Sequence, residues 1–178
     1  MLIPRPVPGE YAPYYETYFA RLPATATDLL ALLREQPAAL RHVLTGTTDA
    51  AAAQPTAPGK WSRKEVLIHL IDTERVFAYR ALAIARGETY PLPAFDQDDY
   101  VRTAGANARP LPDLLVEHAT QRAATVALLG GLPPGAYERV GTASSQRVSV
   151  RALAWVIAGH EAHHQYLLAA LRPAPRPA

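Results

Sequence analysis

The sequence predicts an all-α protein, a four-helix bundle whose helices are joined by long crossover loops. Three observations support this prediction. Apolar residues recur at helical spacing in three segments, β-branched residues seldom alternate with polar ones, and Gly and Pro mark the ends of four helical segments. Two of the connections are long, which is typical of bundles with crossover loops. Because the chain has 178 residues and is 49% hydrophobic, we expect one domain over residues 1–178.

Residues 1–23 form an N-terminal arm rich in Pro and Tyr. Its prolines discourage a long helix and its tyrosines favour burial: Pro4, Pro6, Pro8, Pro13, Tyr11, Tyr14, Tyr15 and Tyr18. We therefore expect an ordered arm with one helical turn. Tyr15 and Tyr18 are candidates to fold over the open end of the bundle and line a pocket, and simple packing against a bundle face is an equal alternative.

The first predicted helix spans residues 24–45. Its apolar residues repeat at helical spacing: Leu29, Leu30, Leu32, Leu33, Leu40, Val43 and Leu44. Pro37 predicts either a kink or a division into two short helices. Gly46 ends the helix, and residues 46–60 are predicted as a loop with one turn at 50–53.

The second predicted helix, residues 62–86, has the clearest signals. Ser62 and Glu65 form a capping box, in which each side chain bonds the backbone N–H of the other residue. One face carries Val66, Leu70, Phe77 and Ile84. Gly87 is the expected C-terminal stop.

A third helix is predicted to begin near Pro112 and to run to about Leu129. The preceding residues 88–109 are predicted as a loop. Its three acidic residues are expected to be solvated and not to form a functional site: Asp96, Asp98 and Asp99.

The last predicted helix begins at Ser149, a suitable N-cap, and runs to about Leu171. Residues 135–148 before it form a polar loop with room for a short hairpin. The Pro-rich tail, residues 172–178, is expected to be frayed.

Composition excludes several classes of function. The chain has no cysteine, so disulfides, Cys-ligated metals and a Cys nucleophile are ruled out, and any thiol must come from a cosubstrate. The net charge is only +2 and no basic stripe occurs, so we expect no nucleic-acid partner. No apolar run is long enough to span a membrane and no secretory signal is visible, so we expect a cytoplasmic protein.

The string GHEAHHQ at residues 159–165 indicates a metal site. Helix residues four apart lie roughly 40° apart, so His160 and His164 can bind one ion together. Both share a stripe with Leu153, Ile157, Leu167 and Leu171. His163 lies at the edge of that stripe and is expected to flank or orient a ligand.

The same string matches the zinc-protease pattern H-E-x-x-H, with Glu161 as the general base. That interpretation needs a third ligand downstream, and no His, Asp or Glu follows His164. The protease alternative is therefore strongly disfavoured.

His69 is the natural third ligand, because it lies mid-helix on a mixed ridge with Thr73 and Arg80. A hydrogen-bonded core histidine is the alternative for this residue taken alone. Asp72 could orient a ligand, or it could pair with Arg75 or Lys64. The remaining histidines are expected to be ordinary helix-surface or edge residues: His42 and His118.

Three segments resemble the DinB-like family of metal-binding four-helix bundles. They are KWSRKEVLIHLIDTE at 60–74, PAFDQDDYV at 93–101 and VSVRALAWVIAGHEAHHQ at 148–165, and the arm resembles the start of one branch. The resemblance implies up-down-down-up helix order and a nickel or zinc ion on a His of the second helix and an H-x-x-x-H pair of the last. By position these are His69, His160 and His164.

Three functions stay open on this resemblance. Some members resemble S-transferases that use bacillithiol, mycothiol or glutathione, which would make the small-molecule partner a low-molecular-weight thiol. A metal-dependent hydrolase would activate water instead, and a stress-response module would bind a ligand without turnover. Glu161 and Asp72 are the candidates for handling protons. A homodimer is also expected.

Overall fold

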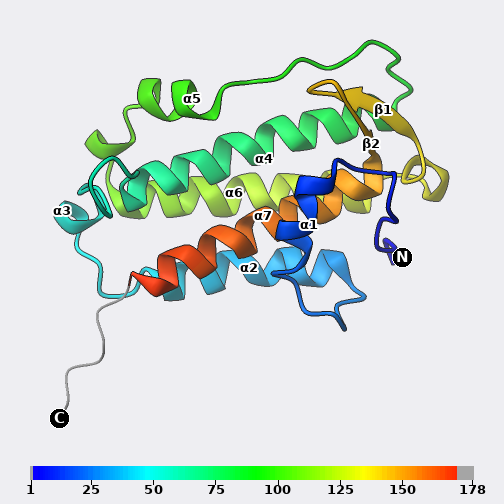
Figure 1. The fold of residues 1–178 in the computed structure, drawn as a ribbon. Helices are drawn as coiled ribbons and strands as arrows, with labels where there is room; N and C mark the ends of the chain where they lie inside the picture. The colour runs from blue at the N-terminus through cyan, green and yellow to red at the C-terminus, as the bar shows by residue number, and fades with distance from the viewer. Residues whose placement is uncertain (1, 172–178) are drawn as a thin grey trace.

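Four long helices form the body of the structure, a computed structural model that describes residues 2–171 (Figure 1). They are α2 (Leu29–Val43), α4 (Arg63–Ala85), α6 (Leu111–Gly130) and α7 (Val150–Ala170). Helix α4 packs against α6 and α7, and α2 packs against the same two helices, so α2 and α4 lie at opposite corners. Helices α2 and α7 run one way and α4 and α6 the other (Figure 1). The all-α class and the up-down-down-up order are therefore confirmed.

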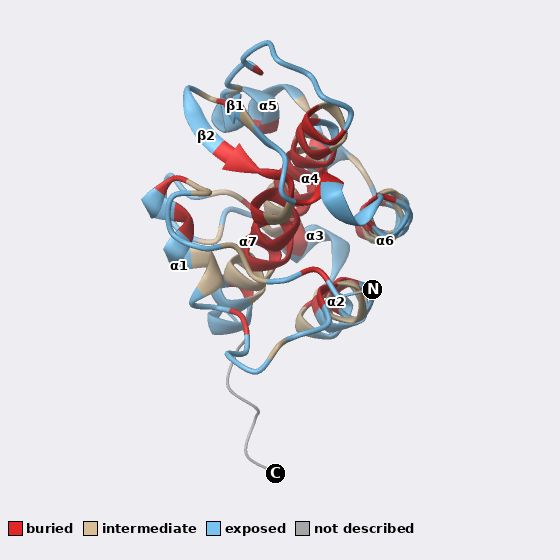
Figure 2. Ribbon diagram, turned by 90° about the vertical axis from the view of Figure 1, so that its right-hand side faces the viewer, coloured by how far each residue is buried: buried red, intermediate tan, exposed pale blue. Residues whose placement is uncertain are grey.

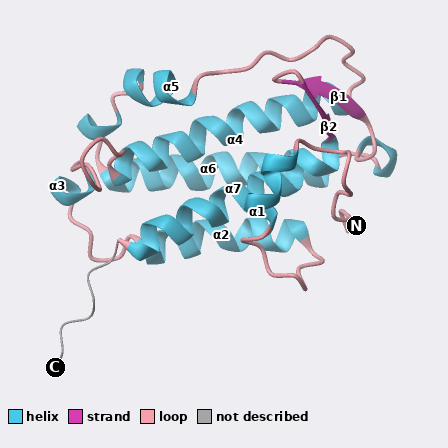
Figure 3. Ribbon diagram, viewed as in Figure 1, coloured by secondary structure: helices cyan, strands magenta, loops and turns pink. Residues whose placement is uncertain are grey.

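Short elements occupy the connections between the long helices (Figure 3). The connection from α4 to α6 passes back along the whole bundle, as a crossover loop must when two parallel helices are joined (Figure 1). In chain order the short elements are η1 (Pro13–Tyr15), α1 (Glu16–Phe19), α3 (Asp49–Ala52), α5 (Gln97–Thr103), η2 (Ala106–Ala108), η3 (Pro134–Ala136), β1 (Val140–Ala143) and β2 (Gln146–Ser149).

The hairpin expected between the last two long helices is present. Strands β1 and β2 are antiparallel, with Ala143 opposite Gln146. The two turn residues, Ser144 and Ser145, have φ of 50° and 61°, in the left-handed region where Asn and Gly are usual. Two serines adopt this turn only if their surroundings hold them there.

The predicted helix starts are confirmed at two caps. Ser62 Oγ accepts from the Glu65 N–H at 3.1 Å, and Glu65 Oε2 accepts from the Ser62 N–H at 2.7 Å. Ser149 Oγ accepts from the Ala152 N–H at 3.0 Å, which starts α7.

Two predicted boundaries were wrong, and the alternative left open at Pro37 is resolved. Helix α2 begins at Leu29 because Asp28 caps it, accepting from the Ala31 N–H at 2.9 Å. It then continues through Pro37 as a single helix, so the two-helix alternative fails. Helix α5 lies inside the predicted loop, because Asp96 accepts from the two N–H groups that open it.

The core is centred on α4 and α7, which are buried over most of their surface, whereas α2 and α6 each expose one side (Figure 2). Trp155 of α7 is 1% exposed because the arm covers it. Its indole N–H lies 3.2 Å from the Ile3 carbonyl and 3.0 Å from the Pro4 carbonyl. The prediction of an ordered arm with a helical turn is therefore confirmed.

The C-terminal end of the bundle differs from the predicted stripe. Leu167 and Leu171 are 44% and 37% exposed, and Leu168 is buried in their place. The tail expected to be frayed, residues 172–178, lies outside the described residues. No helix within residues 2–171 is both long and apolar enough to cross a membrane.

Candidate metal centre

Three imidazoles from two neighbouring helices meet in the bundle. His69 comes from α4, and His160 and His164 come from consecutive turns of α7. The Nε2 atoms of His69 and His160 are 2.9 Å apart. The His164 ring centroid lies 4.9 Å from that of His69 and 4.7 Å from that of His160. One nitrogen from each ring lies within 4.8 Å of the other two, and we call this set the histidine trio.

The protonation state of the trio suits a cation. Burial lowers the pKa of His69 to about 4. Burial and the neighbouring histidines lower the pKa of His164 to about 3 and that of His160 well below its ordinary value. All three rings are therefore neutral at pH 7, and each keeps a nitrogen lone pair for coordination.

The spacing of the trio also suits a cation. Two imidazole nitrogens bound to one ion at about 2.0–2.1 Å lie about 3 Å apart, close to the distance between His69 and His160. Thr73 Oγ1 lies 3.3 Å from Nδ1 of His69, which orients that ring with Nε2 toward the centre. Three protein ligands to one ion would leave coordination positions for water or substrate, as in catalytic rather than structural sites.

A smaller pocket, about 190 Å³, reaches the trio at His160. Its walls come from the arm, α4, the crossover loop, the hairpin turn and α7. The lining residues are Tyr14, Tyr15, Tyr18, Thr73, Phe77, Arg80, Phe95, Gln97, Ser144 and His160.

A larger pocket, about 630 Å³, reaches the trio at His164. It is mostly apolar, and Trp61, whose ring centroid is 4.8 Å from that of His69, forms part of its wall. The other lining residues are Thr56, Ala57, Gly59, Lys60, Val66, Asp98, Leu167, Leu168, Ala170 and Leu171.

The arm tyrosines lie on α7 and line the smaller pocket. The Tyr18 ring centroid is 5.3 Å from that of His160, and Tyr15 is 7% exposed with its ring 6.3 Å from that of Phe77. A Cβ at Gly159 would lie 2.9 Å from backbone atoms of Tyr18. Only glycine at this position lets α1 approach α7 so closely.

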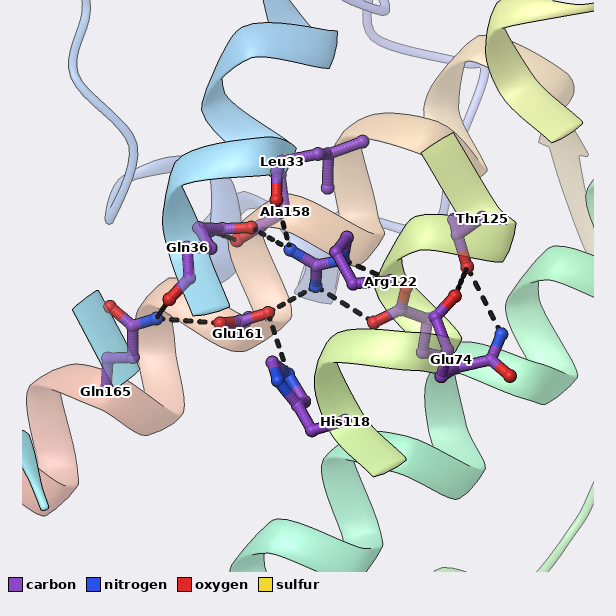
Figure 4. Close-up of polar contacts among 10 residues, drawn as sticks. Leu33, Gln36, Glu74, His118, Arg122, Thr125, Ala158, Glu161 and Gln165 are labelled. Atoms are coloured by element: carbon purple, nitrogen blue, oxygen red, sulfur yellow. Dashed lines mark hydrogen bonds and ion pairs between the residues drawn. The ribbon is translucent and has the colours of Figure 1, made fainter. Parts of the chain in front are cut away.

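A buried network of polar groups crosses the bundle beside the trio (Figure 4). At its centre Arg122 of α6, 2% exposed, donates to both carboxylate oxygens of Glu74 at 2.9 Å. It also donates to Glu161 of α7, and on α2 to Gln36 Oε1 at 2.8 Å. All four long helices therefore share one cation.

Pro37 explains why Arg122 reaches α2. A proline has no N–H, so the Leu33 carbonyl one turn earlier loses its helical partner. Arg122 Nη1 donates to that carbonyl at 3.0 Å. The helix break that Pro37 would otherwise cause is thus compensated from α6.

Glu161 is fully engaged in the network. Burial alone would raise its pKa, but the Arg122 charge and hydrogen bonds from His118 and Gln165 hold the pKa below its usual value. The carboxylate is therefore ionised and can only accept, which fixes the proton of His118 on Nε2, 3.2 Å from Glu161 Oε2.

The residues Glu74, His118 and Glu161 form a second group with metal-ligand geometry. The guanidinium of Arg122 already lies against both carboxylates. A second cation in the same space would be repelled, so this group is a buried ion-pair cluster.

Comparison with known families identifies the chain. The family model described as the DinB superfamily matches residues 17–168. The chain belongs to the DinB superfamily. No curated protein matches it in a sequence search.

Two solved structures share the DinB fold. One is YfiT from Bacillus subtilis, described as a probable metal-dependent hydrolase with an unusual four-helix bundle topology. It has a TM-score of 0.74 and 18% identity over 84% of this chain and 90% of YfiT. The other is a mycothiol-dependent maleylpyruvate isomerase, with a TM-score of 0.64 and 17% identity over 84% of this chain and 62% of the isomerase. At these identities the likeness shows the fold.

The remaining candidate residues of this DinB-superfamily chain lie apart from the trio or at its edge. Asp72 forms an ion pair with Arg75 at 3.0 Å, which is one of the alternatives considered for it, in place of orienting a ligand. His163 lies beside the trio, its ring centroid 5.3 Å from that of His164 and its buried Nδ1 without a hydrogen-bond partner among the described residues. His42 is exposed, as expected.

One expectation for this DinB-superfamily chain was wrong. His118 is 1% exposed, not a surface residue, because Glu161 lies opposite it across the core. Sequence reasoning also missed Arg122 and Glu74, and it placed Arg80 only on the mixed ridge beside His69. Pro37 was the one local signal, since an unpaired carbonyl in a buried helix requires a donor from elsewhere.

Proposed function

We propose that this DinB-superfamily chain holds one divalent ion, nickel or zinc, on His69, His160 and His164 and transfers a low-molecular-weight thiol to a small electrophile. Neutral imidazoles suit both metals. The three ligand nitrogens, their burial and their spacing support the site. A divalent ion there would lower the pKa of a bound thiol and supply its thiolate at neutral pH.

The observation that carries the proposal is the position of the trio between two pockets. His160 lines the smaller pocket and His164 lines the larger one. A hydrolase needs one organic substrate and water, whereas a thiol transferase must bring two organic molecules together. Two pockets that meet at one set of ligands favour the two-substrate reaction.

Other residues support the same choice. The chain has no cysteine, so the nucleophilic sulfur must come from a bound thiol. The two acids considered as bases are both held in ion pairs, Glu161 by Arg122 and Asp72 by Arg75. Trp61 and Tyr18 place aromatic surface beside the trio, with ring centroids 4.8 Å from that of His69 and 5.3 Å from that of His160.

Relatives of the same fold support each half of the proposal. The isomerase is described as mycothiol-dependent, which supports a low-molecular-weight thiol as cosubstrate. YfiT is described as a probable metal-dependent hydrolase, which supports the ion and makes hydrolysis the alternative reaction to test.

The test is a transfer assay on metal-loaded protein. Bacillithiol, mycothiol and glutathione are each mixed with chlorodinitrobenzene, and chloride release is compared with the rate without protein. We expect the protein to accelerate chloride release with one of the three thiols. His164→Ala should abolish this acceleration, and His42→Ala should keep it in full because His42 is exposed.

Two results would overturn the transferase. Hydrolysis of an ester or amide without any thiol, together with no acceleration of chloride release by any of the three thiols, would identify a hydrolase. Metal uptake with neither activity would identify a binding module.

A further inference from the structure

Arg80 is a buried cation without a carboxylate partner. It lies on α4 and is 3% exposed. Within the described part of the chain no Asp or Glu lies within ion-pair distance of its guanidinium. Arg122, which is 2% exposed, binds two carboxylates, whereas Arg80 borders a pocket. Burial of an unpaired charge is costly, so such a group calls for a partner that the chain does not provide.

The contacts of Arg80 orient it without neutralising it. Its Nη2 donates to the Pro93 carbonyl at 2.7 Å and to Ser144 Oγ at 2.8 Å. The guanidinium carbon lies 5.7 Å from the ring centroids of both Phe77 and Phe95. Ser144 makes its contact from a left-handed backbone conformation, with φ of 50°. The hairpin turn therefore holds the guanidinium in one position.

Arg80 lines the smaller pocket, and so does His160 of the trio. Arg80 is the one permanently charged residue in the lining; the rest are aromatic, hydroxyl or amide side chains and one histidine. Tyr15 and Tyr18 place phenol groups in the lining, and a phenol O–H can donate a hydrogen bond to an anion. One positive charge and several neutral donors match a ligand with a single negative charge.

The size of the pocket limits the ligand. Its volume, about 190 Å³, is below the roughly 300–1,000 Å³ typical of pockets for drug-sized molecules. From Thr73, beside the trio, to Arg80 is seven residues of helix, or about 10 Å at about 1.5 Å per residue. Aromatic rings on both sides favour a flat body.

We infer that the smaller pocket binds a small organic acid through its carboxylate, with Arg80 as the anion-binding residue and the rest of the molecule pointing to His160. This inference rests on the proposed function in that it assigns the small electrophile to this pocket. The thiol then takes the larger pocket at His164. The planar fork of arginine suits a carboxylate, which it can bind with two parallel hydrogen bonds. A phosphate dianion would bring two charges to a single cation.

The experiment measures binding of benzoate, its uncharged analogue benzamide, and phenylphosphonate by calorimetry. Each is titrated into metal-loaded protein and into protein stripped by a chelator. We expect benzoate to bind at least about tenfold more tightly than benzamide in both forms, because Arg80 is independent of the metal. We expect phenylphosphonate to bind no more tightly than benzoate.

Variants assign the preference to Arg80. Arg80→Gln should raise the Kd for benzoate at least about tenfold and leave that for benzamide within about twofold. Arg75→Gln, on the exposed face of the same helix, should change neither. The preference of the wild-type protein for benzoate over benzamide is measured without any variant. It therefore tests carboxylate binding in this pocket even if Arg80→Gln fails to fold.

Several results would overturn the inference. They are equal binding of benzoate and benzamide, tighter binding of phenylphosphonate, or an unchanged benzoate preference in a folded Arg80→Gln protein. Failure of the proposed function looks different. A protein that prefers benzoate but takes up no metal refutes the metal site alone, and one that takes up metal without the preference refutes this inference alone.

Discussion

Removal of Arg122 should destabilise the bundle far more than removal of a surface arginine. Arg122→Met keeps the aliphatic volume but leaves Glu74 and Glu161 as buried carboxylates without their cation. It also leaves the Leu33 carbonyl, already without a helical partner at Pro37, with no donor from α6.

The magnitude follows from these lost partners. Breaking a buried ion pair by removing one partner costs about 3–5 kcal/mol, because the other charge stays buried. For a chain of this length that corresponds to a fall in Tm of about 6–20 °C. At an m-value of about 2 kcal/mol/M the urea midpoint falls by about 2 M.

Urea unfolding of metal-free protein, followed by circular dichroism, measures this loss without a contribution from the ion. Combining Arg122→Met with Glu74→Gln and Glu161→Gln should recover at least half of it, since no buried charge is then left alone. Arg102→Met is the control, because Arg102 is 70% exposed in its pair with Asp99, and its midpoint should not move. A loss below about 1 kcal/mol in Arg122→Met, or no recovery in the triple variant, would refute the reasoning.

Two further predictions concern the arm. Gly159→Ala should displace Tyr18 and weaken benzoate binding severalfold, as measured by calorimetry. Gly130→Ala is the control, because its new Cβ would meet only a side chain at 3.6 Å, and it should leave benzoate binding unchanged. Equal benzoate binding by the two variants would contradict the close approach of α1 to α7. The hydrogen bond from Arg151, together with further contacts, holds the pKa of Glu10 below its usual value. The ionised carboxylate therefore contributes its full stabilisation of the docked arm above about pH 4.5, and this contribution is lost as the pH falls through the lowered pKa. The protection factors of the arm amides, which are exchange rates corrected for their intrinsic pH dependence, should therefore fall on acidification. Arg151→Gln should already show low protection at neutral pH, and a fully protected arm in that variant would contradict the assignment.

Much of the fold could be predicted from local signals. The capping box at Ser62, the N-cap at Ser149 and helical spacing of apolar residues place three of the long helices. A cap acts within one turn and the apolar spacing within one helix, so both signals are independent of the rest of the chain. Helix α5 was missed because its cap, Asp96, stands among other acids that suggested a solvated loop.

In the candidate site, too, residues that share a helix could be predicted, whereas contacts between helices could not. His160 and His164 share a helix, so a spacing of four residues was enough to bring them together, and His69 followed as a third candidate. The partners of Glu161 could not be predicted, because Arg122 and His118 reach it across the bundle from a helix more than thirty residues away in the sequence. Such contacts depend on which helices are neighbours and how they are rotated.

Metal content tests the central claim most directly. The protein is purified without a His tag, titrated with nickel and with zinc, and its bound metal is measured by mass spectrometry. We predict about one ion per chain, lost in His160→Ala and His164→Ala and retained in His42→Ala, since three neutral imidazoles are the ligands. Wild-type protein that carries no metal and takes up neither ion would contradict the account.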